Sequence, residues 1–254
     1  PRRHSSAASD VYKRQLRYNS NGLEMPSRLF ELWSHFKRVR FHYSVDSIEE
    51  MNDYIRYPSK WEHTVKQFHL LDNTEDKVEV TVACAVQALN IYYIPDFIKW
   101  KLQQNFKKIN IWPLGAGMIN YHFVYWPPQL NVKSLPQWFK DKTKQKYEEF
   151  YPWLESNWQL SGAPDKDTFM KASYGIKRLQ GMIKFMMSED WSIRMPEFRE
   201  YIIKFDELRE TKFAEVFPDM ADLLDENKDN QVAINLGESI DEKLEKELAD
   251  GGTI

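Results

Sequence analysis

Hydrophobic and polar residues follow two different periods in the first half of the chain. Between residues 77 and 86, Val78, Val80 and Val82 alternate with polar residues, which is the pattern of a strand. Between residues 26 and 36, apolar residues recur every three or four positions, which is the pattern of a helix. The same criteria predict strands at 16–19, 39–45, 77–86, 109–114 and 119–126, and helices at 26–36, 59–71 and 96–106. Because strands and helices alternate, we expect an α/β fold with a parallel sheet and right-handed crossovers.

The second half of the chain changes to a helical pattern. From Leu135 onward, the spacing of apolar residues predicts helices at 137–155, 167–187 and 196–210, and a short helical turn at 211–217. Residues 225–254 hold nine acidic residues, three lysines and no aromatic residue. Such a segment buries too little apolar surface to offset the entropy cost of ordering, so we expect a mostly disordered acidic tail.

The amino-terminal residues are set apart from the fold. Residues 1–15 are polar, lack an initiator Met and show no periodicity. Residues 5–15 are similar to translated sequencing-adaptor sequence, so a non-native leader is expected, with a disordered native tail as the alternative. The chain is therefore expected to have four segments: the leader 1–15, an α/β core 16–134, a helical extension 135–224 and the acidic tail 225–254.

Composition narrows the classes of function. The formal net charge is −3 and the pI is about 6.1, so bulk charge gives no reason to expect a nucleic-acid partner. No apolar run reaches the length of about 18 residues that indicates a membrane span. The single cysteine, Cys84, excludes a disulfide framework within the chain, and its apolar neighbours predict a buried thiol. The histidines show no metal-ligand spacing, so we predict no metal site, and the cysteine usage favours the cytoplasm.

Small polar residues follow the first three expected strands, and an arginine lies in a later helical segment. The set consists of Ser20, Asn21, Ser44, Asp46, Asn90 and Arg56. In parallel α/β folds, ligands bind at the carboxyl ends of strands. Hydroxyl groups suit ribose and a guanidinium fork suits a carboxylate, so the set fits a zwitterionic nucleoside. Ser47 and Glu50 also form a Ser-x-x-Glu capping box, which predicts a helix start directly after Asp46.

This ordered set resembles the core of radical S-adenosylmethionine (SAM) enzymes. Many members carry a Thr-Asn-Gly turn after the third strand, a Ser-x-Asp after the fourth, an Arg on the following helix and an Asn after the fifth strand. The matching positions here are Ser20-Asn21-Gly22, Ser44-Val45-Asp46, Arg56 and Asn90, with Ser in place of Thr. Segments 126–136 and 206–218 are similar to the post-barrel and carboxyl-terminal segments of twitch domain-containing radical SAM proteins. The resemblance covers about residues 16–218.

The resemblance implies a fold and a set of roles. The fold would be the carboxyl-terminal part of a partial (β/α)6 barrel, residues 16–134, followed by a mainly helical extension. Ser44 would bind the ribose of SAM and Arg56 its methionyl carboxylate. Ser20 and Asn21 would line the same pocket, with Asp46 and Asn90 completing the cofactor set. His122, on a later strand near the expected substrate mouth, is a weaker candidate for substrate binding.

The cysteine count limits what this chain can do by itself. It has no Cys-x3-Cys-x2-Cys motif, so it lacks the ligands of the [4Fe–4S] cluster that reductively cleaves SAM. We therefore expect a fragment of a longer enzyme, inactive alone, whose full-length form carries the cluster and makes a 5′-deoxyadenosyl radical for hydrogen abstraction. The substrate is unknown, with peptides and sugars both compatible, and no catalytic residue is assigned.

Two other classes of function remain open at this point. A (β/α)-barrel hydrolase or isomerase would use strand-end carboxylates, with Asp46 as the acid, although no second strand-end carboxylate is evident. A non-catalytic interaction module would instead dock a partner through its aromatic helices. Upstream coding sequence separates the three, because only the radical SAM reading requires a three-cysteine motif there.

Overall fold

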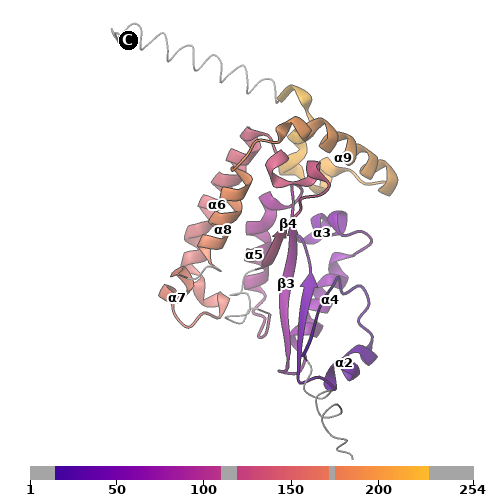
Figure 1. Ribbon diagram of the computed structural model, residues 1–254, viewed down its shortest axis with the longest axis vertical. Coiled ribbons are helices and arrows are strands. Elements are labelled where there is room, and N and C mark those ends of the chain that lie inside the picture. Colours follow the sequence, from indigo (N-terminus) through magenta and orange to yellow (C-terminus); the bar gives the residue numbers. More distant parts are fainter. Residues whose placement is uncertain (1–14, 110–118, 172–174, 229–254) are drawn as a thin grey trace, which may run out of the picture.

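A parallel sheet of four strands forms the centre of the protein (Figure 1). The computed structural model describes residues 15–109, 119–171 and 175–228. The strands pair in chain order, all parallel, as β1 (Gln15–Ser20), β2 (Arg38–Ser44), β3 (Val78–Val86) and β4 (Asn120–Phe123). The predicted α/β class and parallel sheet are confirmed. In the strand predicted at 109–114, residues 110–114 lie outside the described residues.

The sheet has one apolar and one polar face because its strands alternate. Aromatic contacts place helices against the apolar face: Trp33 lies 5.5 Å from Phe41, and Phe68 lies 4.9 Å from Tyr43, between ring centroids. Right-handed crossovers between sequentially ordered strands put their helices on one side of the sheet. These helices are α2 (Ser27–Ser34), α3 (Glu49–Ile55), α4 (Trp61–Asp72) and α5 (Ile94–Gln103).

The predicted capping box after β2 is wrong. Helix α3 begins at Glu49, and Ile48 at its N-cap position makes no side-chain capping bond. The chain stays extended through Ile48, with φ −118° and ψ 159°, so Ser47 lies one residue too early to cap the helix. The Ser47 hydroxyl is buried without a hydrogen-bond partner among the described residues.

The second half of the chain is helical, as predicted. Its α-helices are α6 (Gln137–Ser156), α7 (Lys166–Lys171), α8 (Ile176–Met186), α9 (Met195–Arg209) and α10 (Phe213–Val216). A single helix over 167–187 is wrong, because Gly175 separates α8 from α7. A Cβ at Gly175 would lie 2.7 Å from the Phe169 carbonyl oxygen, so only glycine allows this close contact with α7.

The helical extension shares the hydrophobic core of the sheet. Figure 1 shows α6 and α8 side by side on one flank, and α9 across the end of the molecule that carries α3. On the flank, Phe185 of α8 stacks 3.9 Å from Phe123 of β4, between ring centroids. At the α3 end, the Tyr54 hydroxyl donates a 2.8 Å hydrogen bond to Asp206. The boundary predicted at residue 134 is therefore not a break in the core.

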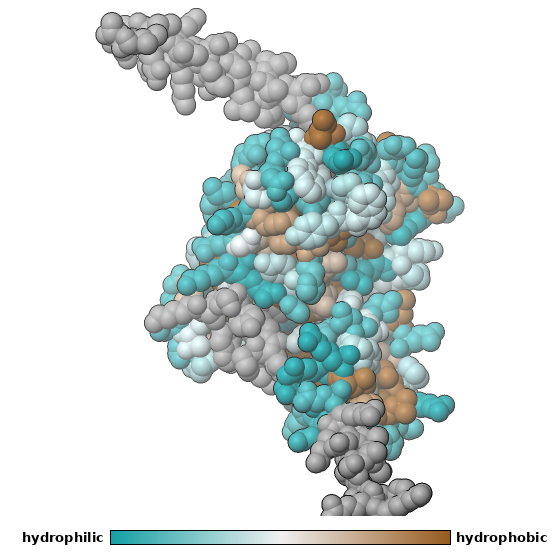
Figure 2. Space-filling view, viewed as in Figure 1, coloured by the Kyte–Doolittle hydropathy of each residue, from teal (hydrophilic) through white to brown (hydrophobic). Residues whose placement is uncertain are grey.

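The chain ends lie mostly outside the described residues. Residues 1–14 of the predicted leader and residues 229–254 of the predicted acidic tail are not described. Within the described ranges, no helix combines the length and apolar character needed to cross a bilayer. The face in Figure 2 is mainly hydrophilic, with hydrophobic surface near α2, where Leu32 and Leu70 are exposed.

Candidate functional site

The turn after β1 depends on Gly22. This residue has φ +64°, in the left-handed region that favours glycine. The Ser20 hydroxyl accepts a 3.1 Å hydrogen bond from the Gly22 amide, and the Asn21 side chain accepts one of 3.3 Å from the Leu23 amide. A Cβ at Gly22 would lie 2.5 Å from Cε2 of Tyr43 in β2. The turn is therefore closed over the Tyr43 ring, and Ser20 helps to build it.

Ser20 and Ser44 lie at the same end of the sheet but on opposite faces. Ser20 pairs in register with Tyr43, whose ring faces the helices. Ser44 is the next residue after Tyr43, so its side chain points to the other face. The Ser44 hydroxyl is half-buried and forms no hydrogen bond with a described residue, which leaves it available to a ligand.

Asp46 and Asn90 join the carboxyl ends of β2 and β3. Oδ1 of Asp46 accepts a 2.7 Å hydrogen bond from the Ala85 amide. The Asn90 amide nitrogen donates 2.9 Å bonds to the carbonyl oxygens of Asp46 and Ala85, and its Oδ1 accepts a 2.8 Å bond from the Gln87 amide. Asp46 is 3% exposed and Asn90 0%. Both predicted site residues therefore position the rim of the sheet.

Arg56 lies beside this connection. Its Nε is 2.8 Å from Oδ2 of Asp46, and its side chain keeps 23% of its exposure. This contact is an ion pair without a hydrogen bond, since the buried Nε makes none. The Nη atoms of Arg56 donate no hydrogen bond to a described residue, so the outer edge of the guanidinium can take a ligand carboxylate.

Three buried polar atoms near Asp46 make no hydrogen bond. They are Oγ of Ser47, Nδ2 of Asn52 and Nε of Arg56, and the last of these still forms an ion pair with Asp46. Asn52 is held there because its Oδ1 accepts a 3.2 Å hydrogen bond from the Asp46 amide. Buried polar groups are usually satisfied, and an unpaired cluster marks a place where ordered water or a ligand completes the bonding. Ser47 was expected only as a helix cap and Asn52 was not singled out, because their positions near Asp46 depend on the loop after β2.

The polar face of the sheet carries a second cluster that the sequence analysis also missed. Nε of Arg17 lies 2.9 Å from Nε2 of His42, and Nδ1 of His42 lies 2.6 Å from the Thr81 hydroxyl. Arg38 and Arg40 both pair with Glu79, the latter at 2.9 Å. The signal was present as Arg38, Arg40 and His42 at every second position of β2, beside Glu79 and Thr81 of β3.

His122 lies on the same side of the sheet. It occupies β4 opposite Ala85 of β3 and is exposed. Its charge is one of the influences that lower the pKa of His42, after burial and the charges of Arg17 and Arg40. His122 therefore lies on the strand next to β3, and its place near a substrate stays a prediction.

Cys84 is confirmed as a buried thiol. It is 2% exposed in β3, and its Sγ lies 3.7 Å from the Asp46 carbonyl oxygen. Burial is the main cause that raises the pKa of this thiol well above its usual value. A protonated, enclosed thiol is a poor nucleophile and a poor metal ligand.

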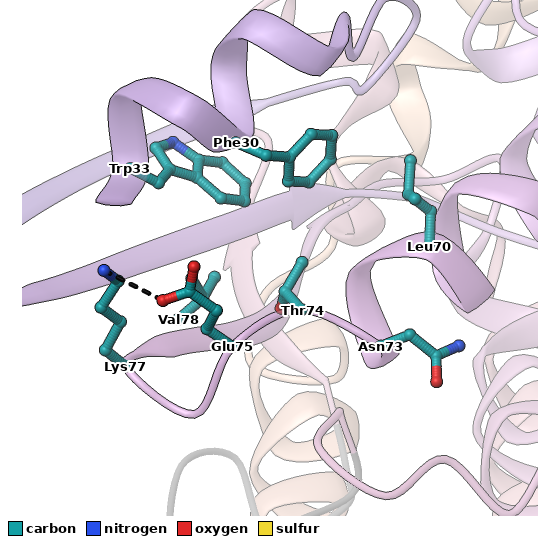
Figure 3. A pocket seen from close by; sticks show the side chains of 8 residues that line it. All are labelled: Phe30, Trp33, Leu70, Asn73, Thr74, Glu75, Lys77 and Val78. Carbon is teal, nitrogen blue, oxygen red and sulfur yellow. Dashed lines mark ion pairs between the residues drawn. The ribbon is translucent and has the colours of Figure 1, made fainter. Parts of the chain in front are cut away.

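A separate cavity of about 250 Å³ lies at the opposite end of the sheet (Figure 3). Phe30 and Trp33 of α2, Leu70 of α4 and Val78 at the start of β3 line it. Lys77 and Glu75 form a 3.0 Å ion pair beside it. The cavity shares no residue with the rim formed by the carboxyl ends of the strands.

The residues present fit SAM and do not fit a [4Fe–4S] cluster. The unpaired atoms around Asp46, the Ser44 hydroxyl and the Arg56 guanidinium offer hydrogen bonds to a polar nucleoside such as SAM. A [4Fe–4S] cluster needs several thiolate ligands, and the chain has only the buried Cys84. Among the described residues, no group of three His, Cys, Asp or Glu side chains is placed to hold a metal ion.

Comparisons of the chain with protein-family models, with curated proteins and with solved structures find no match.

Proposed function

We propose that residues 16–134 are the carboxyl-terminal part of a partial (β/α) barrel that binds SAM in a radical SAM enzyme. The observation that supports the proposal is the cluster of buried polar atoms that make no hydrogen bond near Asp46, at the carboxyl end of β2. Strand order β1-β2-β3-β4 supports a barrel segment, because a barrel winds in one direction. In this family SAM is the source of the radical that abstracts hydrogen from the substrate.

The chain's own contribution is to bind and orient SAM. Arg56, held by Asp46, would receive the methionyl carboxylate, and Ser44 would bond the ribose from the polar face. Asp46 and Asn90 would keep the two strand ends at a fixed spacing. Cluster ligands would come from another part of a longer protein, as the resemblance implies. A peptide or sugar substrate in the cytoplasm remains part of this proposal.

In this arrangement Asp46 cannot serve as the general acid of the hydrolase alternative. A general acid must reach its substrate, whereas both carboxylate oxygens of Asp46 are engaged, one by the Ala85 amide and one by Arg56. No observation favours the interaction module over the SAM site.

Titration of SAM into the whole chain tests the proposal. Arg56→Ala should weaken SAM binding about 10- to 150-fold, because hydrogen bonds between charged groups contribute about 1.5–3 kcal/mol. Arg56→Lys should recover only part of the loss, since an ammonium keeps the charge and loses the fork. Arg194→Ala, which removes an exposed arginine paired with Glu197, is the matched control and should bind SAM as the wild type does. Equal SAM affinity in Arg56→Ala and the control, with the fold intact, would refute the assignment.

A further inference from the structure

The polar face of the sheet holds a fixed chain of side chains across three strands. Arg17 of β1 contacts His42 of β2, which contacts Thr81 of β3, at 2.9 Å and 2.6 Å. The Arg17 Nε–H can only donate, so Nε2 of His42 accepts and Nδ1–H donates to the Thr81 hydroxyl. His42 is thereby held as a neutral imidazole and is 8% exposed.

Among the described residues, positive charge on this face exceeds negative charge. Arg17 and Arg40 are direct partners in the register of β1 and β2, and Arg40 is opposite Glu79 in β3. Glu79 is shared between Arg38 and Arg40, so one carboxylate serves two guanidinium groups. Like charges directly opposite each other destabilise a sheet. A sheet that keeps three arginines here against one glutamate sacrifices stability, which points to a bound anion.

Arg17 and Arg40 also have hydrogen-bond donors that no described residue uses. The Arg17 side chain reaches His42 through Nε, and Arg40 reaches Glu79 through Nε. Their Nη atoms donate no hydrogen bond to any residue that the structure describes. Because neighbouring strands are about 4.8 Å apart, the two guanidinium groups can approach oxygens of the same anion.

We propose that Arg17 and Arg40 bind a phosphate group of a small molecule on this face of the sheet, with His42 holding Arg17 in place. A dianionic phosphate matches the two uncompensated positive charges, and guanidinium forks suit its oxygens. The anion site is argued from these side chains alone. The further assignment, that this face of the sheet binds the substrate and that the substrate is therefore phosphorylated, rests on the proposed function.

Titration of inorganic phosphate into the whole chain, followed by NMR of the Arg17 and Arg40 Nε–H groups and the His42 ring, tests the site. Ionic strength is held constant with sodium chloride, since salt screens exposed charges. We expect saturable shifts at these three side chains. Arg17→Gln and Arg40→Gln should each weaken phosphate binding about 10-fold or more. Arg194→Gln, far along the chain in an exposed pair with Glu197, should leave it unchanged.

Glu79→Gln separates a binding role from a structural one. Removing the competing carboxylate should tighten phosphate binding by about 3- to 10-fold, because it frees the guanidinium groups of Arg38 and Arg40. A purely structural network predicts weaker or unchanged binding in this variant. The proposal would be overturned if phosphate caused no shifts in the wild type, a result that does not depend on the folding of any variant. It would also be overturned if the two arginine variants bound phosphate as tightly as the control. Equally tight binding of acetate would overturn its assignment to phosphate.

The same titrations distinguish this proposal from the proposed function. SAM is read out at Ser44 and Arg56, and phosphate at Arg17 and Arg40. Phosphate binding without SAM binding would keep the anion site and remove its interpretation as the substrate side. SAM binding without phosphate binding would keep the proposed function and overturn the anion site.

Discussion

Gly22 sets the shape of the rim after β1 by two independent constraints. Its φ of +64° is costly for any residue with a Cβ, and a Cβ would also meet the Tyr43 ring at 2.5 Å. The ring cannot move away freely, because the Tyr43 hydroxyl donates a 3.2 Å hydrogen bond to the Thr64 carbonyl oxygen. Backbone strain and steric contact therefore act together at this one position.

Gly22→Ala should lower the free energy of unfolding by about 1–3 kcal/mol, measured by urea denaturation. Gly181→Ala is the matched control in α8, where a Cβ would meet only the Tyr121 hydroxyl oxygen at 3.8 Å. That control should be neutral or more stable by up to about 1 kcal/mol, since alanine favours a helix. Equal effects of the two substitutions would show that the turn does not need glycine.

His42 gives the fold a dependence on pH. Burial, then the charges of Arg17, Arg40 and His122, lower the pKa of this side chain from its usual 6.5. As the pH falls through about 6.5, the unfolded chain binds a proton that the folded chain does not, so the folded state loses stability. The loss is absent above that pH, where the imidazole is neutral in both states.

Urea denaturation at about pH 7.5 and pH 5.5 measures this effect, since the window lies on either side of the ordinary histidine pKa. The wild type should be less stable at the lower pH. His42→Gln should show a smaller difference between the two conditions, and His69→Gln, at an exposed position of α4, should keep the wild-type difference. An unchanged pH dependence in His42→Gln would contradict a neutral, constrained imidazole.

At the scale of elements, Asn90 connects two strand ends through its side chain. Its amide makes three hydrogen bonds, to the backbone of Asp46, Ala85 and Gln87, while fully buried. Truncation would leave these backbone groups unpaired in the interior, which is more costly than the loss of an exposed bond. The position of β2 relative to the loop after β3 therefore depends on one side chain.

Asn90→Ala should lower the free energy of unfolding by about 2–4 kcal/mol. Asn73→Ala removes one exposed hydrogen bond, of 2.8 Å to the His69 carbonyl oxygen, and should cost less than about 1 kcal/mol. Chemical denaturation of both variants checks the difference. A small loss in Asn90→Ala, similar to that of Asn73→Ala, would mean that the strand ends are held by other contacts.

The elements themselves were predictable where one physical signal dominated. Alternation of apolar and polar residues identified β2 and β3, because the apolar side chains of each strand face the helices. The cap at Ser47 was not, because the loop stays extended through Ile48, and propensity does not register such tertiary constraints. The break between α7 and α8 was hidden because apolar spacing continues across Gly175.

The strand-end positions of the candidate site residues were predictable, and their contacts were not. Ser20, Ser44, Asp46 and Asn90 do lie at neighbouring strand ends. The bond from Asn90 to Asp46 spans 44 residues of sequence, so the positioning role of both residues could not be seen from spacing alone. The cluster at Arg17 and His42 was overlooked because charges alternating along a strand are ordinarily a solvated face.

At the scale of the whole molecule, the parallel sheet has two distinct ends. Its carboxyl end carries the polar rim and the unpaired atoms around Asp46, and its amino end carries the cavity beside Trp33 and Val78. Parallel strands in chain order make this polarity inevitable, because every strand ends at the same side. We propose that SAM binds at the carboxyl end.

The most direct test is to map SAM on the isotopically labelled whole chain by NMR. We expect chemical shifts to change at the amides of Ser20, Asn21 and Ser44 and at the Arg56 side chain. We expect no change at Phe30, Trp33 or Val78, which line the cavity at the other end of the sheet. Shift changes confined to that cavity, or none at saturating SAM, would show that SAM does not bind at the carboxyl end.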